Sequence, residues 1–155
     1  MTRTAQCSCG ALQITTDGDP EITMACNCTN CQRRTGSAFG VVAYFERSKV
    51  LARRGEGRQF THLSDSKRRL ERTFCPHCGS TVHWQAELFP GMIGVAVGCF
   101  NEQDFPAPNI AAWHNSKLDW VEFPCDWMRL PEQDPGQALA EGAEDPVAAR
   151  EPVSC

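Results

Sequence analysis

Three cysteines lie within six residues of one another, at Cys26, Cys28 and Cys31. Three thiols this close cannot all pair as disulfides, but their sulfurs can converge on one soft divalent cation. Zinc takes cysteine sulfur at ~2.3 Å in tetrahedral geometry, and three protein ligands leave one coordination position for a small molecule. That arrangement is typical of catalytic zinc, whereas a fourth protein ligand would make the site structural. The triplet therefore predicts a zinc site with an open position.

Two cysteine pairs lie far apart in the sequence, Cys7 with Cys9 and Cys75 with Cys78. Residues 75–79 read Cys-Pro-His-Cys-Gly, a zinc knuckle in which a tight turn directs both sulfurs to one metal and the glycine can take a positive φ. In an extended segment Cys7 and Cys9 would point to the same face. Together the two pairs supply four thiolates, enough to close a tetrahedral structural site whose binding energy is folding energy.

The spacing leaves the division into four and three open, because the triplet could take a ligand from another cluster. The alternative that all seven are buried apolar cysteines is disfavoured by the knuckle and by the tight triplet. Each histidine, at His62, His77, His83 and His114, lacks a partner at metal-site spacing. We therefore expect the histidines to be structural or exposed rather than ligands.

The composition is that of a globular protein, with 155 residues, 41% hydrophobic and 22% charged. No apolar run approaches the roughly 18 residues of a membrane helix, so no membrane partner is expected. The first six residues contain no apolar signal segment. Ten cysteines in such a chain are better explained as metal ligands than as disulfides, which favours a reducing, cytoplasmic location.

The charge is unevenly distributed, although its net value of -4 disfavours nucleic-acid binding. Residues 47–72 hold nine lysines or arginines against three acids. Solvated strand surface explains them better than a phosphate-binding face, because no nucleic-acid motif accompanies them. Residues 131–155 hold six acids and several prolines. This composition predicts a zinc-binding domain over 1–130 and an acidic, Pro/Ala-rich tail over 131–155.

Short strands with turns between them dominate the predicted secondary structure. Leu12 and Ile14 alternate with polar residues, and residues 41–45 form a β-rich apolar run. Residues 50–60 and 66–74 have the short-strand and glycine-turn rhythm of an antiparallel sheet. No long helix is predicted, so we expect the cysteine triplet to sit on a loop carried by strands.

Three motifs resemble the family of glutathione-dependent formaldehyde-activating enzymes (GFA), which includes the centromere protein V type of domain. They are Cys-Ser-Cys-Gly-Ala over residues 7–11, Cys-Asn-Cys-Thr-Asn-Cys-Gln-Arg over 26–33 with Gly36 and Phe39, and Phe-Cys-Pro-His-Cys-Gly-Ser over 74–80. The similarity runs from about Cys7 to Phe123. Two positions depart from the family pattern, because Asn27 and Asn109 stand where many members have histidine.

The resemblance implies a mainly β protein with a β-tent type of fold, built of antiparallel sheets. It also implies two Zn²⁺ per chain. The structural zinc would be held by Cys7, Cys9, Cys75 and Cys78, and the catalytic zinc by Cys26, Cys28 and Cys31.

The function implied is that of a carbon-sulfur lyase similar to S-(hydroxymethyl)glutathione synthase. Its partners would be glutathione and formaldehyde or a related small electrophile. Arg33 and Arg34 follow the triplet and could attract the glutathione carboxylates, although two solvated arginines explain them equally well. The alternative is a non-catalytic zinc module that binds a protein or nucleic acid, and only the basic stretch at 47–72 favours it.

Overall fold

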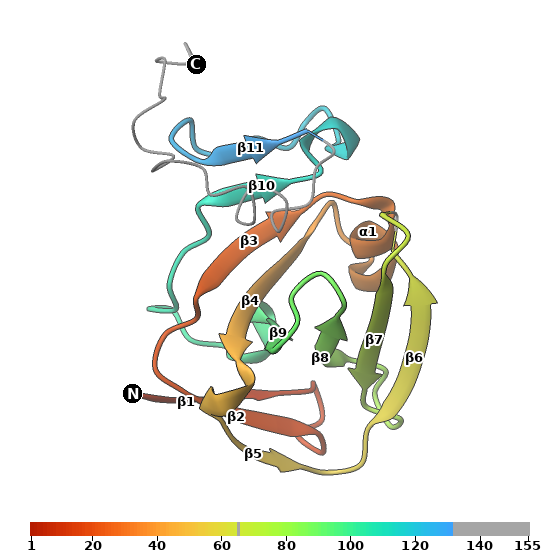
Figure 1. Ribbon diagram of the computed structural model, residues 1–155, viewed down its shortest axis with the longest axis vertical. Coiled ribbons are helices and arrows are strands. Elements are labelled where there is room, and N and C mark those ends of the chain that lie inside the picture. Colours follow the sequence, from red (N-terminus) through yellow and green to blue (C-terminus); the bar gives the residue numbers. More distant parts are fainter. Residues whose placement is uncertain (65, 132–155) are drawn as a thin grey trace.

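A computed structural model describes residues 1–64 and 66–131, and in this part of the chain the protein is mainly β with one short α-helix (Figure 1). The predicted mainly β class is confirmed. Of the predicted tail, all but residue 131 lies outside the described residues, and the domain division at 130 stays a prediction. No helix among the described residues has the length and apolar character needed to cross a membrane.

The strands form two sheets. The three-stranded sheet has the order β1 (Thr2–Gln6), β2 (Gln13–Asp17) and β5 (Val50–Arg54). The eight-stranded sheet has the order β11 (Met128–Leu130), β10 (Ile110–Ala112), β3 (Ile22–Cys26), β4 (Gly40–Glu46), β9 (Met92–Ala96), β8 (Thr81–Ala86), β7 (Arg69–Phe74) and β6 (Arg58–Leu63). The α-helix α1 spans Thr29–Thr35, and short 3-10 turns lie at Arg47–Lys49, Val97–Cys99 and His114–Ser116.

Most neighbouring strands are antiparallel, as expected, but β10 runs parallel to both β3 and β11. Ala112 of β10 pairs with Cys26 at the end of β3, and Gly40 of β4 pairs with Cys26 on the other side. The first cysteine of the triplet therefore lies between two strands, in the body of the larger sheet.

The two faces of β4 contact different parts of the core. Ala43 and Phe45 pack with Ile14, Cys7 and other side chains next to the three-stranded sheet. Val42 and Tyr44 point to the opposite face, because side chains alternate along a strand, and pack with Trp84 and Phe89. This second face also lines the cavity described below.

Strand β1 was not predicted, because its buried positions carry little apolar signal. Arg3 and Ala5 are the buried residues of Thr2–Gln6. The Arg3 guanidinium forms ion pairs with Glu102 and Asp19 and lies over the Phe105 ring. A buried arginine in place of an apolar residue hides the alternation by which a strand is recognised in a sequence.

Candidate metal centres and their cavity

The first cysteine cluster joins two turns. Cys7 and Cys9 lie in the turn between β1 and β2, and Cys75 and Cys78 lie in the turn between β7 and β8. The expectation that Cys7 and Cys9 lie in an extended segment is wrong. The Cys7 carbonyl accepts a hydrogen bond from the Gly10 N–H at 2.9 Å, and the Leu12 N–H donates to Cys7 Sγ at 3.2 Å.

The knuckle turn has the predicted geometry. Its backbone is closed by hydrogen bonds between Cys75 and both Ser80 and Gly79, each 2.9 Å long. Gly79 takes a φ of 76°, which favours glycine over residues with a Cβ. The two turns are linked to each other, because the Ser8 and Ser80 hydroxyl oxygens lie 2.9 Å apart.

The four sulfurs of this cluster lie at metal-site separations. All lie within 4.8 Å of one another, with Cys7 Sγ 3.5 Å from Cys9 Sγ and Cys9 Sγ 3.7 Å from Cys75 Sγ. A tetrahedron with zinc–sulfur bonds of ~2.3 Å has sulfurs about 3.8 Å apart. Hydrogen bonding with the Ser80 side chain and backbone lowers the pKa of Cys78 to about 5, which favours the thiolate that a metal binds. The donor set fits a closed site for a soft cation such as zinc.

The second cluster, of Cys26, Cys28 and Cys31, is positioned by the junction of β3 and α1. Cys26 ends β3, Cys28 is the N-cap of α1, and Cys31 lies in its first turn. The Cys31 N–H donates to Cys28 Sγ at 3.4 Å. The segment expected to be a loop is therefore a short helix. It has no buried residues, so its sequence shows no apolar periodicity from which a helix could be predicted.

These three sulfurs also lie within 4.8 Å of one another, so the cluster can hold a metal ion. No fourth histidine, cysteine or acidic residue among positions 1–64 and 66–131 joins the group. The four histidines belong to neither cluster. His77 is exposed in the knuckle turn and His83 is buried in β8, whereas His62 lines the cavity.

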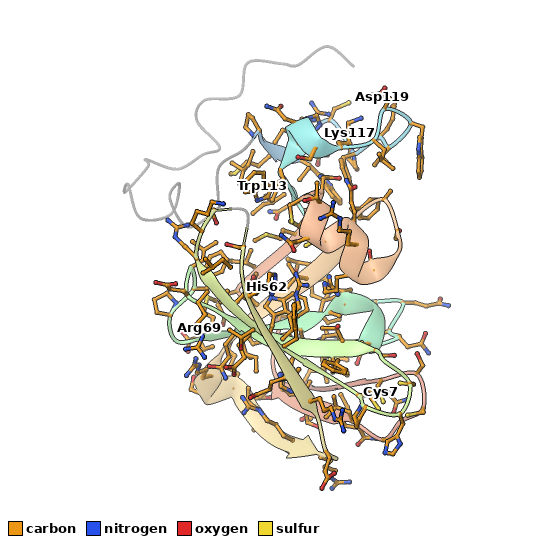
Figure 2. All side chains as sticks on the ribbon, turned by 90° about the vertical axis from the view of Figure 1, so that its right-hand side faces the viewer. Cys7, His62, Arg69, Trp113, Lys117 and Asp119 are labelled. Atoms are coloured by element: carbon orange, nitrogen blue, oxygen red, sulfur yellow. The ribbon has the colours of Figure 1, made fainter. Side chains whose placement is uncertain are left out.

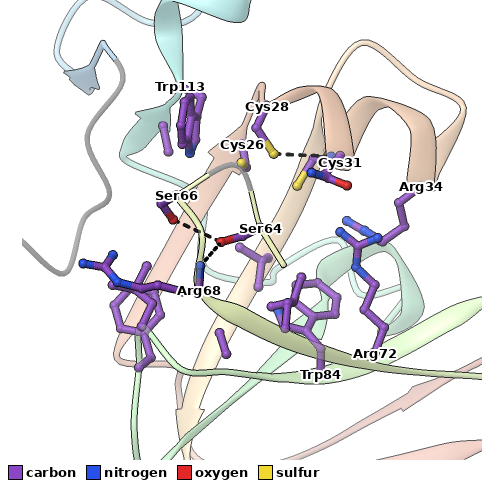
Figure 3. Close-up of a pocket in the computed structure, with 18 of the residues that line it drawn as sticks. Cys26, Cys28, Cys31, Arg34, Ser64, Ser66, Arg68, Arg72, Trp84 and Trp113 are labelled. Carbon is purple, nitrogen blue, oxygen red and sulfur yellow. Dashed lines mark hydrogen bonds between the residues drawn. The ribbon is translucent and has the colours of Figure 1, made fainter. Parts of the chain in front are cut away.

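The three-cysteine cluster opens on a cavity of about 110 Å³, whereas none of the four cysteines of the other cluster lines it (Figure 3). Figure 2 shows the separation, with Cys7 near one end of the molecule and Trp113 of the cavity wall toward the other. A three-thiol site on a cavity wall can accept a fourth ligand from solution. A four-thiol site in a pair of turns already has a complete tetrahedral donor set.

Two arginines face this cluster. Arg34 of α1 and Arg72 of β7 line the cavity, and their guanidinium groups lie side by side near Cys31 (Figure 3). Hydrogen bonding with Cys26 and Cys28, and then the charges of these arginines, hold the pKa of Cys31 well below its usual range. Arg34 also lies over the Trp84 ring, with Cζ 4.8 Å from the ring centroid. The charges of both arginines therefore favour the thiolate of Cys31.

Arg33 and Arg34 are adjacent in the sequence and were both predicted to attract glutathione carboxylates, but they occupy different environments in the structure. Arg34 lines the cavity, whereas Arg33 is exposed and is not part of the wall. Arg72, Tyr44 and Trp84 were not recognised as site residues. They lie on strands distant in sequence from the triplet, and no local motif marks them.

Asn27, one of the two departures from the family pattern, is fully buried and holds the cysteine triplet in place. Its side-chain amide donates to the Ala112 carbonyl at 2.9 Å, which ties the turn after β3 to β10. The backbone carbonyl of Asn27 accepts a hydrogen bond from Gln32 Nε2 at 2.8 Å, which ties the same turn to α1. Asn109, the other departure, is exposed next to β10 and does not line the cavity.

Known proteins resemble this chain in sequence or in fold. Residues 2–116 match the family of glutathione-dependent formaldehyde-activating enzymes. A Colletotrichum graminicola protein, named as a candidate glutathione-dependent formaldehyde-activating enzyme, is 26% identical over 121 residues, which cover 75% of this chain. The match spans only 62% of that relative's length.

A crystal structure of a Rhodobacter sphaeroides protein, solved by a structural genomics centre, has a similar fold. The TM-score is 0.50 at 22% identity, and the match covers 66% of this chain and 90% of the other. The family match extends over most of the described domain and contains both cysteine clusters. The chain therefore belongs to the family of glutathione-dependent formaldehyde-activating enzymes.

Proposed function

We propose that this protein is a zinc-dependent carbon-sulfur lyase that makes and breaks the adduct of glutathione with a small aldehyde, as an S-(hydroxymethyl)glutathione synthase does. The observation that carries the proposal is the contrast between the clusters. One has four thiols in two surface turns, and the other has three thiols on the wall of a cavity. We assign a structural zinc to Cys7, Cys9, Cys75 and Cys78, and a catalytic zinc to Cys26, Cys28 and Cys31.

Zinc bound by the three cysteines would keep an added thiol deprotonated at neutral pH, since a coordinating thiol loses its proton. Arg34 and Arg72 balance the negative charge that three cysteine thiolates and a substrate thiolate bring together. The same arginines stabilise the oxyanion that develops on an aldehyde. Arg68, also on the cavity wall, offers a guanidinium suited to a glutathione carboxylate.

The reaction is an addition without a change of redox state. The glutathione sulfur forms a bond to the carbonyl carbon, and the π electrons of the carbonyl move to its oxygen. That oxygen takes up a proton, which replaces the one that the thiol released. The reverse sequence breaks the carbon–sulfur bond and is the lyase direction. Glutathione is the thiol of reducing compartments, which fits the expected cytoplasmic location.

Exchange spectroscopy by NMR tests the proposal directly. The metal-loaded protein is mixed with ¹³C-formaldehyde and glutathione, and the rate of exchange between free aldehyde and adduct is measured. We expect faster exchange than without protein, and no such acceleration when N-acetylcysteine replaces glutathione. Absence of acceleration in a protein that holds two metal ions per chain would contradict the proposal.

A further inference from the structure

Most of the surface of the cavity beside the three-cysteine cluster is apolar, and the proposed chemistry does not use this apolar part. Trp84 and Trp113 lie on opposite sides of it (Figure 3). Met24, Val42, Tyr44 and Phe89 complete this part of the wall. These six side chains form an apolar compartment, which is continuous with the polar and cationic groups at the cysteines.

The polar atoms of this apolar compartment bind each other. The Trp84 indole N–H donates to the Tyr44 hydroxyl at 3.3 Å, and both side chains are buried. The Tyr44 and Phe89 rings pack with centroids 4.4 Å apart. Burial raises the pKa of Tyr44 well above its usual value, so the phenol stays neutral. Apart from Arg34, which lies over the Trp84 ring, this side of the cavity offers a ligand ring faces and aliphatic groups.

The size of the cavity exceeds what formaldehyde requires. Its volume of about 110 Å³ compares with roughly 30 Å³ for the share of one water molecule in the liquid. A cavity of roughly 150 Å³ lined by apolar side chains accepts benzene, and the present cavity of about 110 Å³ is smaller, so a phenyl ring is the upper limit of size. Formaldehyde has two non-hydrogen atoms and no apolar substituent, so it would leave the apolar compartment without a ligand group to contact.

From this amphipathic cavity we infer that the aldehyde partner carries an apolar substituent, an aryl or branched alkyl group no larger than a phenyl ring. The substituent occupies the compartment between Trp84 and Trp113 while the carbonyl faces the cysteines and Arg34. This inference rests on the proposed function for the reaction, but the shape and the lining of the cavity carry the choice of substrate.

The adduct formed from such an aldehyde is a hemithioacetal. The thiol sulfur bonds to the carbonyl carbon, and the carbonyl π pair moves to the oxygen. The thiol releases one proton, and the oxygen takes up one proton. The product is a thioether carbon that bears a hydroxyl group and the apolar substituent. Atoms and electrons balance without an oxidant, a reductant or a further co-reactant.

Binding of unreactive thioethers tests the substituent without requiring turnover. S-benzylglutathione and S-methylglutathione are titrated into the metal-loaded full chain by calorimetry. Because a phenyl ring buries far more apolar area than a methyl group, we expect the benzyl compound to bind at least about tenfold more tightly. Equal affinities would overturn the inference. In NMR spectra the benzyl protons should show Overhauser effects to the Trp84 indole, and their absence would also overturn it.

A matched pair of variants on β4 tests the location. Val42 lines the cavity, whereas Val41 lies on the opposite face of the strand and is not part of the wall. Val42→Phe should fill the compartment and remove the benzyl preference while S-methylglutathione still binds. Val41→Phe should retain the preference. A benzyl preference that survives in a folded Val42→Phe protein would place the ring elsewhere. The Overhauser measurement on the unmodified chain tests the location even if Val42→Phe does not fold.

Benzyl alcohol alone separates this inference from the proposed function. If glutathione is not the thiol partner, the formaldehyde exchange assay fails, but benzyl alcohol should still bind the unmodified chain and not Val42→Phe. If exchange is accelerated while neither benzyl alcohol nor the benzyl thioether shows a preference for the cavity, the proposed reaction stands and the apolar substituent is wrong.

Discussion

The Sγ atoms of Cys9 and Cys75 lie 3.7 Å apart, although 66 positions separate these residues along the chain. A metal ion held between them would close a long loop and would tie the three-stranded sheet to the larger one. The cost of closing a loop grows with its length, so a link of this kind contributes more to stability than a local one.

We therefore predict that Cys75→Ser loses one metal ion per chain and either unfolds or loses at least about 3 kcal/mol of unfolding free energy, because metal binding energy is folding energy. Metal analysis and thermal denaturation by circular dichroism measure both effects. Cys99→Ser is the matched control, since Cys99 is half-buried and belongs to neither cluster. A stable Cys75→Ser protein with two metal ions would refute the assignment of the structural site.

Cys28→Ala should separate loss of metal from loss of fold. The three ligands lie within six residues, so their metal constrains only the junction of β3 and α1. We expect one metal ion to be lost, together with glutathione-adduct exchange. The unfolding free energy should fall by about 1 kcal/mol, the usual cost of a lost N-cap. Metal content, circular dichroism and exchange are measured on one preparation. Global unfolding, or full activity without that metal, would contradict the catalytic assignment.

His83 predicts a pH dependence of stability. Burial, and then the charge of Arg53, lower its pKa to about 4, so the folded state holds this histidine neutral where the unfolded state binds a proton. The unfolded state is therefore favoured as the pH falls from about 6.5 toward 4, and stability at pH 5 should be about 2 kcal/mol lower than at pH 7 from this group alone.

His83→Gln cannot titrate, so it should lose less stability between pH 7 and pH 5 than the unmodified protein. Chemical denaturation at both pH values measures the difference. Protonation of the metal ligands affects both proteins alike, and the comparison removes it. An identical pH dependence in the two proteins would mean that His83 is not held neutral by the fold.

Gly40→Ala tests the position of Arg34. A Cβ at Gly40 would lie 2.5 Å from Arg34 Nη2, so the guanidinium must move. The displaced atom is the end of a flexible side chain, and we expect little loss of stability. With the positive charge farther from the three-cysteine site, the thiolate form of an added thiol is less stabilised, so the pH profile of adduct exchange should shift to higher pH. Gly98→Ala, where a Cβ meets nothing within 4 Å, should leave the profile unchanged. An unshifted profile in Gly40→Ala would show that Arg34 does not act on the cluster.

Local spacing made the cysteine groups that can hold a metal predictable. The residues at 75–79 favour a tight turn by themselves, and Gly79 has the positive φ expected of it. The triplet needs only a few residues to bring its sulfurs together. The mainly β class was likewise predictable, because strands such as β4 carry a continuous apolar run that needs no tertiary information to detect.

Local sequence patterns did not predict a strand whose buried residue is charged, or a short helix that is held in place by contacts with other segments. Strand β1 was not predicted because Arg3 occupies a buried position in it. The charge of Arg3 is compensated by Glu102 and Asp19, which lie in other parts of the chain. Helix α1 has no buried residue, and Gln32 attaches it to the carbonyls of Asn27 and Ser116. Such contacts cannot be deduced from the residues next to them.

The sequence by itself determined which sulfurs could bind metal, because ligand type and short spacing are local properties of the chain. Only the tertiary structure decided that Cys26, Cys28 and Cys31 face a cavity with Arg72 and Trp84 in its wall. Those two residues come from β7 and β8, and the pairing of strands far apart in sequence brings them to the triplet. The apolar character of the cavity is a product of that packing, since no single segment contains it.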